Sequence, residues 1–599
     1  MGIGAVIHKT GGAGMAADLN IRITGGAGQG VHTLGAIISR MAVLWGYHFH
    51  ATQDYMSRIR GGRNSYSVRI GSDPVRAGRD EADILLCLAP GHLPHFLPRL
   101  SKGGLALADT PSASPQVLSS PLKQMAVSAG SPILANMAGA GILACALGIP
   151  LDILAPLLAA DFKGDFLEKN RKALALGEEW AMGRLGDTFR LSRAPSSPRV
   201  VMSGNEALAL GAIAGGCKFA AGYPMTPGTG ILSVLADNGP AVGLVFEQAE
   251  DEIAALNMAI GASYAGARAM VATSGGGFAL MVEALSLAGM LETPVVIALG
   301  MRPGPATGMP TRTEQGDLDF VLSAGHGEFP RLVLSPGSPE EAFDLAQHAM
   351  DLAEAYQVPA FLLTDQYLAD TIVDMDPAKF DIRPVRRHLV RGTEVPRAAN
   401  GRYLRYAVTG DGVSPMAVPG EPGITVVAGS DEHTEDGHLT EDHDARIRMV
   451  EKRRRKGEAL AQRTLPPLVS GPPNGDAVLI GFGSTKEVIE ETRQILAREG
   501  IAVAAVHLRQ VWPFPAKEMA EIAPRYDAAL TVENNISGQL ARLIRRESGA
   551  EIAGTVSRYD GLPFTPETLA PEARKRIWEA LSTRMSRTHG AKGAETSGS

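Results

Sequence analysis

Short apolar runs alternate with stretches of helical periodicity along most of the chain. Near the N-terminus, strand-like runs at 21–24 and 65–70 flank a pattern at 33–44 in which apolar residues recur every three or four positions. Such alternation indicates a mainly parallel α/β unit. We expect it to occupy residues 19–190, because a segment rich in Pro and Ser follows at 192–198.

The same alternation returns in residues 199–375 and again in residues 473–585. Between them, residues 376–472 lose periodicity and gain Pro, Gly and charge, which indicates a connecting segment on the surface. The basic run at 451–456 lies within a helical pattern, so we interpret it as a solvated or salt-bridged helix face. The expected fold class is therefore α/β, with three mainly parallel sheet units.

Composition excludes several classes of protein. The 599 residues are 45% hydrophobic and 20% charged, as in ordinary globular domains. The net charge of −7 provides no basic field for nucleic acid. Three isolated cysteines cannot build a disulfide framework or a four-cysteine cluster. No secretory signal and no apolar run of about 18 residues is visible, so we expect a cytoplasmic protein without a membrane span.

Two glycine-rich loops of the first unit could bind an anion. The loop at 25–30 follows a strand and precedes a helix, but it matches neither the dinucleotide fingerprint nor a Walker loop. Its Gly28 and Gly30 either permit tight packing or expose backbone amides to an anionic, CoA-like ligand. The loop at 58–63 places three arginines around Gly61 and Gly62, and is either a solvated loop or a phosphate or carboxylate contact.

Three further junctions lie in the second unit, each at the end of a predicted strand. They span residues 222–229, 273–277 and 299–312, and an acidic stretch at 247–252 begins a helix rich in small residues. Open parallel sheets bind ligands at the carboxyl ends of their strands. These junctions together therefore predict a binding site at this edge of the second sheet.

Metal ligands are not evident in the sequence. The Gly410-Asp411-Gly412 turn lacks the later asparagine of the thiamine diphosphate metal motif. The histidines at 433, 438 and 443 are five residues apart in a glycine-containing stretch, which favours a surface loop over a metal site. We therefore assign no metal site to this chain.

The junctions carry motifs of a known family. Tyr-Pro-Met-Thr-Pro at 223–227, Gln-Ala-Glu-Asp-Glu at 248–252, Thr-Ser-Gly-Gly-Gly at 273–277 and the Gly-Pro-Ala-Thr-Gly-Met-Pro-Thr-Arg-Thr-Glu-Gln-Gly-Asp run at 304–317 resemble, in order, motifs of the 2-oxoacid:ferredoxin oxidoreductases. Residues 25–31 and 60–62 resemble the family's γ domain, and the third unit a transketolase-C-like domain. The resemblance covers nearly the whole chain, and is strongest to a γ–α fusion of the 2-oxoglutarate type. Two positions depart from the motifs: Gly228 where Ser is common, and Gly276 where Pro is common.

The resemblance implies half of a shared active site. Thiamine diphosphate would lie between this chain's pyrimidine-type domain and a β subunit that carries Mg and a [4Fe-4S] cluster. Glu250 would hydrogen-bond the aminopyrimidine, and Thr226 and Arg302 would meet the substrate's 2-oxo and carboxylate groups. Further contacts implied are Tyr223, Pro224, Thr273, Ser274 and Gly275 for the cofactor, Thr311 and Arg312 for a distal carboxylate, and Gly28, Gly30, Arg60, Gly61 and Gly62 for CoA.

The function implied is oxidative decarboxylation of 2-oxoglutarate with CoA to succinyl-CoA, CO2 and reduced ferredoxin, or the reverse reaction. The expected assembly is a dimer of αβ heterodimers that works with ferredoxin. Pyruvate or a branched-chain oxoacid remains open as the substrate. A second hypothesis, motivated by Gly228 and Gly276, is a non-catalytic CoA-binding or assembly subunit.

Overall fold

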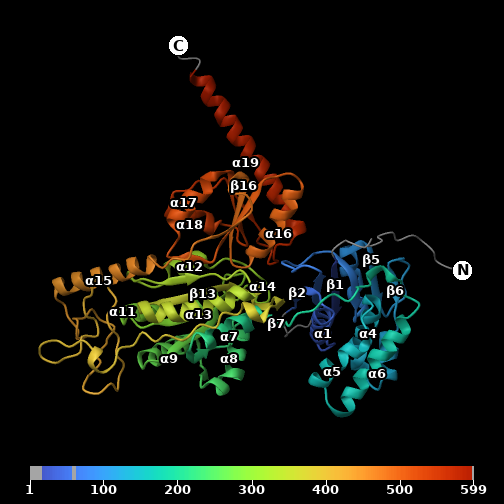
Figure 1. The fold of residues 1–599 in the computed structure, drawn as a ribbon, viewed down its shortest axis with the longest axis horizontal. Helices are drawn as coiled ribbons and strands as arrows, with labels where there is room; N and C mark the ends of the chain where they lie inside the picture. The colour runs from blue at the N-terminus through green and yellow to red at the C-terminus, as the bar shows by residue number, and fades with distance from the viewer. Residues whose placement is uncertain (1–16, 57–61, 596–599) are drawn as a thin grey trace. The chain divides into compact units, whose positions relative to one another are not determined.

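The computed structural model describes residues 17–56 and 62–595, which divide into two compact units (Figure 1). The first unit contains the chain up to Met202 together with Thr371–Lys379 and Thr565–Glu567. The second contains Ser203–Asp370, Phe380–Phe564 and the helical residues from Thr568 onward.

The first unit is built on an eight-stranded mixed sheet. The strand order is β6-β5-β4-β1-β3-β2-β14-β7, and the strands are β1 (Asp18–Gly25), β2 (His48–Asp54), β3 (Asn64–Gly71), β4 (Ala82–Cys87), β5 (Leu100–Ala108), β6 (Val117–Ser119), β7 (Val200–Ser203) and β14 (Ile372–Met375). The strands β1, β4, β5 and β6 are parallel, as expected. However, β3 runs antiparallel to both β1 and β2. The nine residues between β2 and β3 (55–63) are too few for the crossover connection that a parallel pair requires. The first sheet therefore combines a parallel half with an antiparallel one, whereas the other two sheets are mainly parallel.

Close helix packing covers this sheet. The principal helices are α1 (Val31–Leu44), α3 (Leu122–Ser128), α4 (Ala135–Leu147), α5 (Ala155–Asp161) and α6 (Gly164–Ala181). Glycines allow α4 and α6 to approach, since a Cβ on Gly141 would lie 2.0 Å from the Leu174 carbonyl oxygen, and one on Gly177 would lie 2.0 Å from that of Ala138. Each glycine faces a backbone carbonyl of the other helix, so neither position has room for a larger side chain.

The chain leaves and re-enters the first sheet at its edge. Strands β7 and β14 stand at the two ends of the segment that we expected to form the second unit, yet both belong to the first sheet. Asp374 of β14 accepts hydrogen bonds from the Phe49 amide at 2.7 Å and from Arg199 Nη1 at 2.6 Å. This carboxylate therefore fixes the edge where both strands join.

The second unit contains a seven-stranded sheet of order β18-β12-β13-β11-β10-β8-β9, parallel except for β18. Its strands are β8 (Cys217–Gly222), β9 (Val245–Gln248), β10 (Arg268–Ser274), β11 (Val295–Met301), β12 (Leu332–Leu334), β13 (Pro359–Asp365) and β18 (Gln510–Trp512). The central strands β10, β11 and β13 are buried at every position, as expected of a parallel sheet with helices on both faces. These helices are α7 (Gly204–Ala214), α8 (Thr229–Val242), α9 (Glu252–Tyr264), α10 (Gly275–Leu280), α11 (Val282–Met290), α12 (Leu318–Ser323), α13 (Pro339–Tyr356) and α14 (Gln366–Asp370).

A five-stranded sheet of order β15-β17-β16-β19-β20 belongs to the same unit. Its strands are β15 (Leu468–Ser470), β16 (Gly475–Phe482), β17 (Val503–Leu508), β19 (Tyr526–Glu533) and β20 (Gly554–Ser557), and its helices are α16 (Thr485–Arg498), α17 (Ala516–Ile522), α18 (Gln539–Ser548) and α19 (Pro566–Glu595). One apolar core runs through both sheets, from Val333 of β12 to Val506 of β17. The two sheets are joined because β18, which follows β17, pairs with β12. The fold class expected from the sequence, α/β with three sheets, is confirmed.

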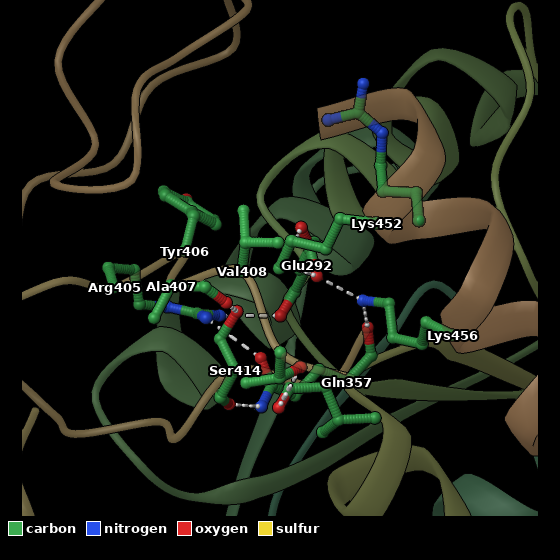
Figure 2. Close-up of polar contacts among 12 residues, drawn as sticks. Glu292, Gln357, Arg405, Tyr406, Ala407, Val408, Ser414, Lys452 and Lys456 are labelled. Carbon is green, nitrogen blue, oxygen red and sulfur yellow. Dashed lines mark hydrogen bonds and ion pairs between the residues drawn. The ribbon is translucent and has the colours of Figure 1, made fainter. Parts of the chain in front are cut away.

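A buried charge cluster anchors the irregular residues 380–442 and helix α15 (His443–Ala461) to the seven-stranded half (Figure 2). Lys452 Nζ lies 2.7 Å from Glu292 Oε1, Lys456 also pairs with Glu292, and all three side chains are buried. Arg405 donates to the Gln357 side chain at 2.8 Å and to the Glu292 carbonyl at 2.7 Å. Burial lowers the pKa of Lys456 to about 7, and Glu292 partly offsets that shift. Of the two interpretations of the basic run, the structure supports the salt-bridged one.

The histidine-containing stretch before α15 is partly buried. His433, expected on a surface loop, is buried against the Tyr406 ring at 3.8 Å between centroids, and its Nδ1 contacts the Asp431 carbonyl. In the described parts of the chain, no cluster of three or more His, Cys, Asp or Glu side chains could hold a metal ion. Nor does that part of the chain contain a helix with the length and apolar character needed to span a membrane.

The charge cluster predicts a large effect of one substitution. Glu292→Gln leaves two buried ammonium groups without their carboxylate, and should destabilise the second unit by about 3–5 kcal/mol. We expect a lower denaturation midpoint and faster proteolysis within residues 380–442. Glu451→Gln is the matched control, because Glu451 pairs with Arg454 on the exposed face of α15. Equal midpoints for the two variants would contradict the anchoring role of Glu292.

Candidate active site

Four neighbouring strands of the seven-stranded sheet end at the same edge. In the order β9-β8-β10-β11, they finish at Gln248, Gly222, Ser274 and Met301. All four are parallel, so the loops that follow them lie side by side. This edge gathers the loops that carry most of the residues singled out in the second unit.

The loops after β8 and β11 touch each other. Arg302 Nη1 donates to the Thr226 carbonyl at 2.7 Å. A Cβ on Gly300 would lie 2.5 Å from Pro227, so the strand and the loop fit together only because residue 300 is glycine. Thr226 and Arg302 are therefore adjacent, while Tyr223 and Pro224 are exposed beside them.

Three acids at the start of α9 have different surroundings. The Ala249 amide donates to the Gly222 carbonyl at 3.0 Å, which brings this segment next to the loop after β8. Glu250 is exposed. Asp251 caps α9 by accepting from the Ala254 amide at 2.7 Å, as expected for an acid at a helix start. Glu252 is buried, and its Oε1 has no hydrogen-bond partner among the described residues.

The end of β10 leads directly into α10, without the turn expected at residues 273–277. Thr273 and Ser274 are fully buried, and Ser274 Oγ has no partner in the described structure. A Cβ on Gly277 would lie 2.2 Å from Thr273 Oγ1 and 2.6 Å from Glu252 Oε1. The glycine therefore lets the helix start approach both polar groups.

Asp317, which the sequence did not single out as a site residue, lies at the same helix start. A Cβ on Gly275 would be 2.5 Å from Asp317 Oδ2, an oxygen that is buried and has no partner among the described residues. Burial raises the pKa of Asp317 to about 6, against the opposing charge of Arg302. Burial also lowers the pKa of Arg302. The pKa of Glu314 is raised, mainly by burial and secondly by the negative charge of Asp317. The signal for Asp317 was its place at the end of the 304–317 motif.

The loop between β11 and α12 reaches the five-stranded half. A Cβ on Gly561 would lie 3.2 Å from Arg312 Cβ, and the Thr313 amide donates to the Gly561 carbonyl at 3.2 Å. Gln315 exchanges backbone and side-chain hydrogen bonds with Asn534, at 2.7 Å and 3.0 Å. Thr311 and Arg312 are thus half-buried near the second sheet of this unit, further along the loop than Arg302.

The glycine loop of the first unit borders a cavity of about 370 Å³, lined by Gly26, Gly28, Gly30, Val31, His32, Gln53, Asp54, Tyr55, Asn64, Ser65 and Tyr66. Gly28 and Gly30 have φ values of 82° and 71°, a backbone region that favours glycine. Gly62 is exposed and packs on Met56. Arg60 and Gly61 lie outside the described residues.

Three family models match the chain in succession. Residues 20–180 match the model described as pyruvate ferredoxin/flavodoxin oxidoreductase. Residues 210–452 match pyruvate flavodoxin/ferredoxin oxidoreductase, thiamine diP-bdg, and residues 475–569 match pyruvate:ferredoxin oxidoreductase core domain II. The second match contains the edge described above, so the candidate site lies in a thiamine diphosphate-binding type of domain.

Similarity extends over whole proteins. The α subunit of 2-oxoacid:ferredoxin oxidoreductase 2 from Aeropyrum pernix is 31% identical over 96% of this chain and 100% of its own length. The chain belongs to the 2-oxoacid:ferredoxin oxidoreductases, as an α subunit. The 2-oxoglutarate oxidoreductase subunit KorA from Mycobacterium tuberculosis is 29% identical over 94% of this chain and 92% of its own. The family resemblance expected from the motifs is thus confirmed.

A solved structure supports the same assignment. The 2-oxoglutarate:ferredoxin oxidoreductase from Magnetococcus marinus, determined with 2-oxoglutarate, coenzyme A and succinyl-CoA bound, superimposes with a TM-score of 0.87. Its sequence is 31% identical, and the match covers 94% of this chain and 99% of that one. This α subunit therefore shares the fold of that chain over almost its full length.

The residues at the edge formed by β9, β8, β10 and β11 suit the aminopyrimidine ring of thiamine diphosphate, the cofactor named in the matching family model. Glu252 Oε1, Ser274 Oγ and Asp317 Oδ2 are buried and unpaired within the described structure, and such atoms favour a ligand that supplies hydrogen bonds. The glycines at 275 and 277 bring the helix backbone close to the same space. These buried oxygens are hydrogen-bonding groups of the kind that a bound heterocycle would need.

The two glycines that depart from the family motif should respond differently to substitution. A Cβ on Gly228 would lie 2.9 Å from both the backbone nitrogen and oxygen of Thr273, whereas one on Gly276 would meet only the Ala306 oxygen, at 3.6 Å. We expect Gly228→Ala to destabilise the protein by about 1–3 kcal/mol. Gly276→Ala, inside α10, should be neutral or stabilising by up to about 1 kcal/mol. Denaturation midpoints test this, and a stable Gly228→Ala variant would refute the packing argument.

Proposed function

We propose that this chain is the α subunit of a CoA-acylating 2-oxoglutarate:ferredoxin oxidoreductase. The complex would convert 2-oxoglutarate and CoA to succinyl-CoA and CO2 with reduction of ferredoxin, or run the reverse reaction. The observation that carries the proposal is the convergence of Thr226, Arg302, Glu252 and Ser274 at one sheet edge of a family α subunit. The substrate in the name of the KorA relative and the ligands in the Magnetococcus marinus structure support 2-oxoglutarate.

The substrate would be held by one cation and one hydroxyl. A guanidinium binds a carboxylate through parallel hydrogen bonds, so Arg302 suits the carboxylate next to the 2-oxo group. Thr226, whose carbonyl already fixes Arg302, would direct its hydroxyl to the 2-oxo oxygen. Thr311 and Arg312 lie further along the same loop and would meet the distal carboxylate of 2-oxoglutarate.

Thiamine diphosphate, when bound, supplies the nucleophilic carbon and the electron sink that decarboxylation of a 2-oxo acid requires. Tyr223, Pro224, Thr273, Ser274 and Gly275 would line its pyrimidine side. A carboxyl group at the start of α9 would exchange a proton with the ring nitrogen. We predicted Glu250 for this role, and the structure offers Glu252 as a second candidate, because its unpaired Oε1 is buried against Thr273 and Gly277.

A pair of isosteric substitutions distinguishes the two acids. If Glu252 exchanges the proton, Glu252→Gln in the assembled complex should lower kcat by about 100-fold or more, while Glu250→Gln retains most activity. The measurement is CoA-dependent reduction of a viologen dye, with thiamine diphosphate binding followed separately by calorimetry. The opposite pattern would assign the proton transfer to Glu250. Full activity of both variants would contradict a role for either acid, and would favour an assembly or CoA-binding subunit.

CoA binding is proposed for the cavity of the first unit. Gly28 and Gly30 line it with backbone. Arg60, Gly61 and Gly62 belong to the basic segment at 58–63 of the sequence, of which Arg60 and Gly61 lie outside the described residues. A glycine loop between a strand and a helix offers amides to phosphate oxygens. Arginine provides the matching fork for a phosphate.

A β subunit would close the site. Apolar side chains are exposed on the loops and helices that surround it: Tyr223, Ile253, Leu280 and Met309. Exposed apolar groups gathered around a polar pocket are typical of an interface with another protein. The β subunit would carry Mg and the [4Fe-4S] cluster that passes electrons to ferredoxin, in a cytoplasmic dimer of αβ heterodimers.

Charge introduced on this rim should weaken the complex. We expect Ile253→Asp and Leu280→Asp each to lower the affinity for the β subunit by about tenfold or more, since each buries an unpaired charge in an apolar contact. Ile382→Asp is the control, because Ile382 is even more exposed but belongs to the connecting segment. Association is measured by interferometry with purified β subunit. Unchanged affinity for both rim variants would place the interface elsewhere.

The decisive experiment is a substrate panel on the copurified complex. Pyruvate, branched-chain 2-oxo acids and 2-oxoglutarate are compared by kcat/KM in CoA-dependent dye reduction. Preference for 2-oxoglutarate that is lost with Arg312→Ala supports the proposal. Full turnover by the isolated chain with thiamine diphosphate would contradict the shared site.

A further inference from the structure

We infer that the hydrogen bond between Thr313 and Asp365 determines substrate specificity, because it sets the spacing of two arginines on the loop after β11, residues 302–313. These arginines are Arg302 and Arg312, and a fixed spacing between them selects a 2-oxo acid with a second carboxylate. Thr313 and Asp365 are positioning residues that act through Arg312. The inference rests on the proposed function, in which the two arginines bind the two carboxylates of the substrate.

The loop begins and ends at the same level of the seven-stranded sheet. It leaves β11 after Met301, whose register partner on the parallel strand β13 is Asp365. At the other end of the loop, Thr313 Oγ1 donates to Asp365 Oδ1 at 3.2 Å. The loop therefore returns to the residue that lies beside its starting point. Both side chains are buried, so water does not compete for this hydrogen bond.

Neighbouring amides fix the direction of the bond. The Tyr367 amide donates to Thr313 Oγ1 at 3.3 Å, which leaves the hydroxyl proton for Asp365. The Leu368 amide donates to the same oxygen of Asp365, at 3.0 Å. Tyr367 and Leu368 belong to α14, the helix that follows β13. Thr313 is therefore attached to the end of a strand and the helix after it.

Each arginine is supported at its own end of the loop. Arg302 donates to the Thr226 carbonyl at 2.7 Å. Arg312 directly precedes Thr313, and a Cβ on Gly561 would lie 3.2 Å from Arg312 Cβ. The Gly561 carbonyl accepts from the Thr313 amide at 3.2 Å. The peptide that joins Arg312 to Thr313 is thus bound on one side by Gly561, while the Thr313 side chain is bound by Asp365.

Hydrogen bonds within the loop also restrict its length. The Met309 amide donates to the Pro303 carbonyl and the Arg312 amide to the Met309 carbonyl, both at 3.0 Å. A Cβ on Gly308 would lie 1.7 Å from the Pro303 oxygen, and its φ of 53° favours glycine, so only glycine permits this turn. The fold rather than the substrate therefore sets where the two guanidinium groups lie. An acid without a distal carboxylate forfeits the contact with Arg312.

The experiment compares 2-oxoglutarate with 2-oxopentanoate, which has the same carbon chain but lacks the distal carboxylate. KM and kcat are measured in the assembled complex by CoA-dependent dye reduction. Thr313→Val removes the hydroxyl with little change of shape, and should raise KM for 2-oxoglutarate by about tenfold, the effect of one hydrogen bond. The kcat for 2-oxoglutarate and both constants for 2-oxopentanoate should stay nearly unchanged, because neither depends on the position of Arg312.

Two further single variants serve as controls. Thr313→Ser keeps the hydroxyl and should retain the parental preference for 2-oxoglutarate. Thr531→Val is matched for the loss of a buried threonine hydroxyl, which bonds to Thr555 at 2.9 Å within the five-stranded sheet. It should also keep the parental preference, since this pair does not contact the loop.

A double variant separates positioning from a general loss of stability. Arg312→Ala leaves no cation for Thr313 to position, so adding Thr313→Val to it should cause no further loss of preference for 2-oxoglutarate. The same loss in both backgrounds would overturn the inference. So would a parental preference in Thr313→Val, or an equal loss for both acids. A parental complex that does not prefer 2-oxoglutarate would instead overturn the proposed function.

Discussion

The segment between β11 and α12 depends on hydrogen bonds that cross from one sheet to the other. Gln315, near the end of this segment, makes most of these bonds: its backbone amide and side chain contact Asn534 and Phe482, and its carbonyl accepts from Asn535 at 3.1 Å. These groups are buried, so every lost bond would leave an unsatisfied polar atom. Arg302 precedes this fixed point and Asp317 follows it. The five-stranded half of the unit therefore positions the loop that carries Arg302 and Asp317, although this loop follows a strand of the seven-stranded sheet.

Much of this arrangement was accessible from the sequence, because it depends on local pattern. Alternating apolar runs predicted α/β layers, and parallel strands require their carboxyl ends to meet at one edge. Strand order predicted only that the loops carrying Thr226 and Arg302 end at one edge; their pairing was implied by the family resemblance, and the structure shows the hydrogen bond between them. The helical basic run was likewise recognised, and charge pairing was one of its two interpretations.

What the sequence did not reveal depends on contacts between distant residues. Strands β7 and β14 join the first sheet because of partners more than a hundred residues away, such as Asp374 with Phe49. Lys452 and Lys456 can be buried because both form ion pairs with a single acid, Glu292, which follows helix α11. Neither of these long-range contacts alters the hydrophobic periodicity of the residues involved, so the sequence pattern did not predict them. The different burial of Glu250 and Glu252 follows from the path of the chain at one helix start, which sequence spacing does not resolve.

The polar atoms left unpaired at the site have a physical consequence. Glu252, Ser274 and Asp317 each keep a buried oxygen without a partner among the described residues, and this costs folding free energy. Other buried polar atoms of this unit, among them Ser263 Oγ and His348 Nε2, also have no partner among the described residues, so the lack of a partner does not by itself distinguish this edge. What distinguishes these three oxygens is their place at an edge that exposed apolar side chains such as Ile253 and Leu280 surround, so a ligand and a partner that cover this edge would stabilise the chain. A cofactor and a partner that bind at this edge would satisfy the unpaired oxygens and remove the apolar side chains from water. This gain in stability favours an obligate complex over a chain that acts alone.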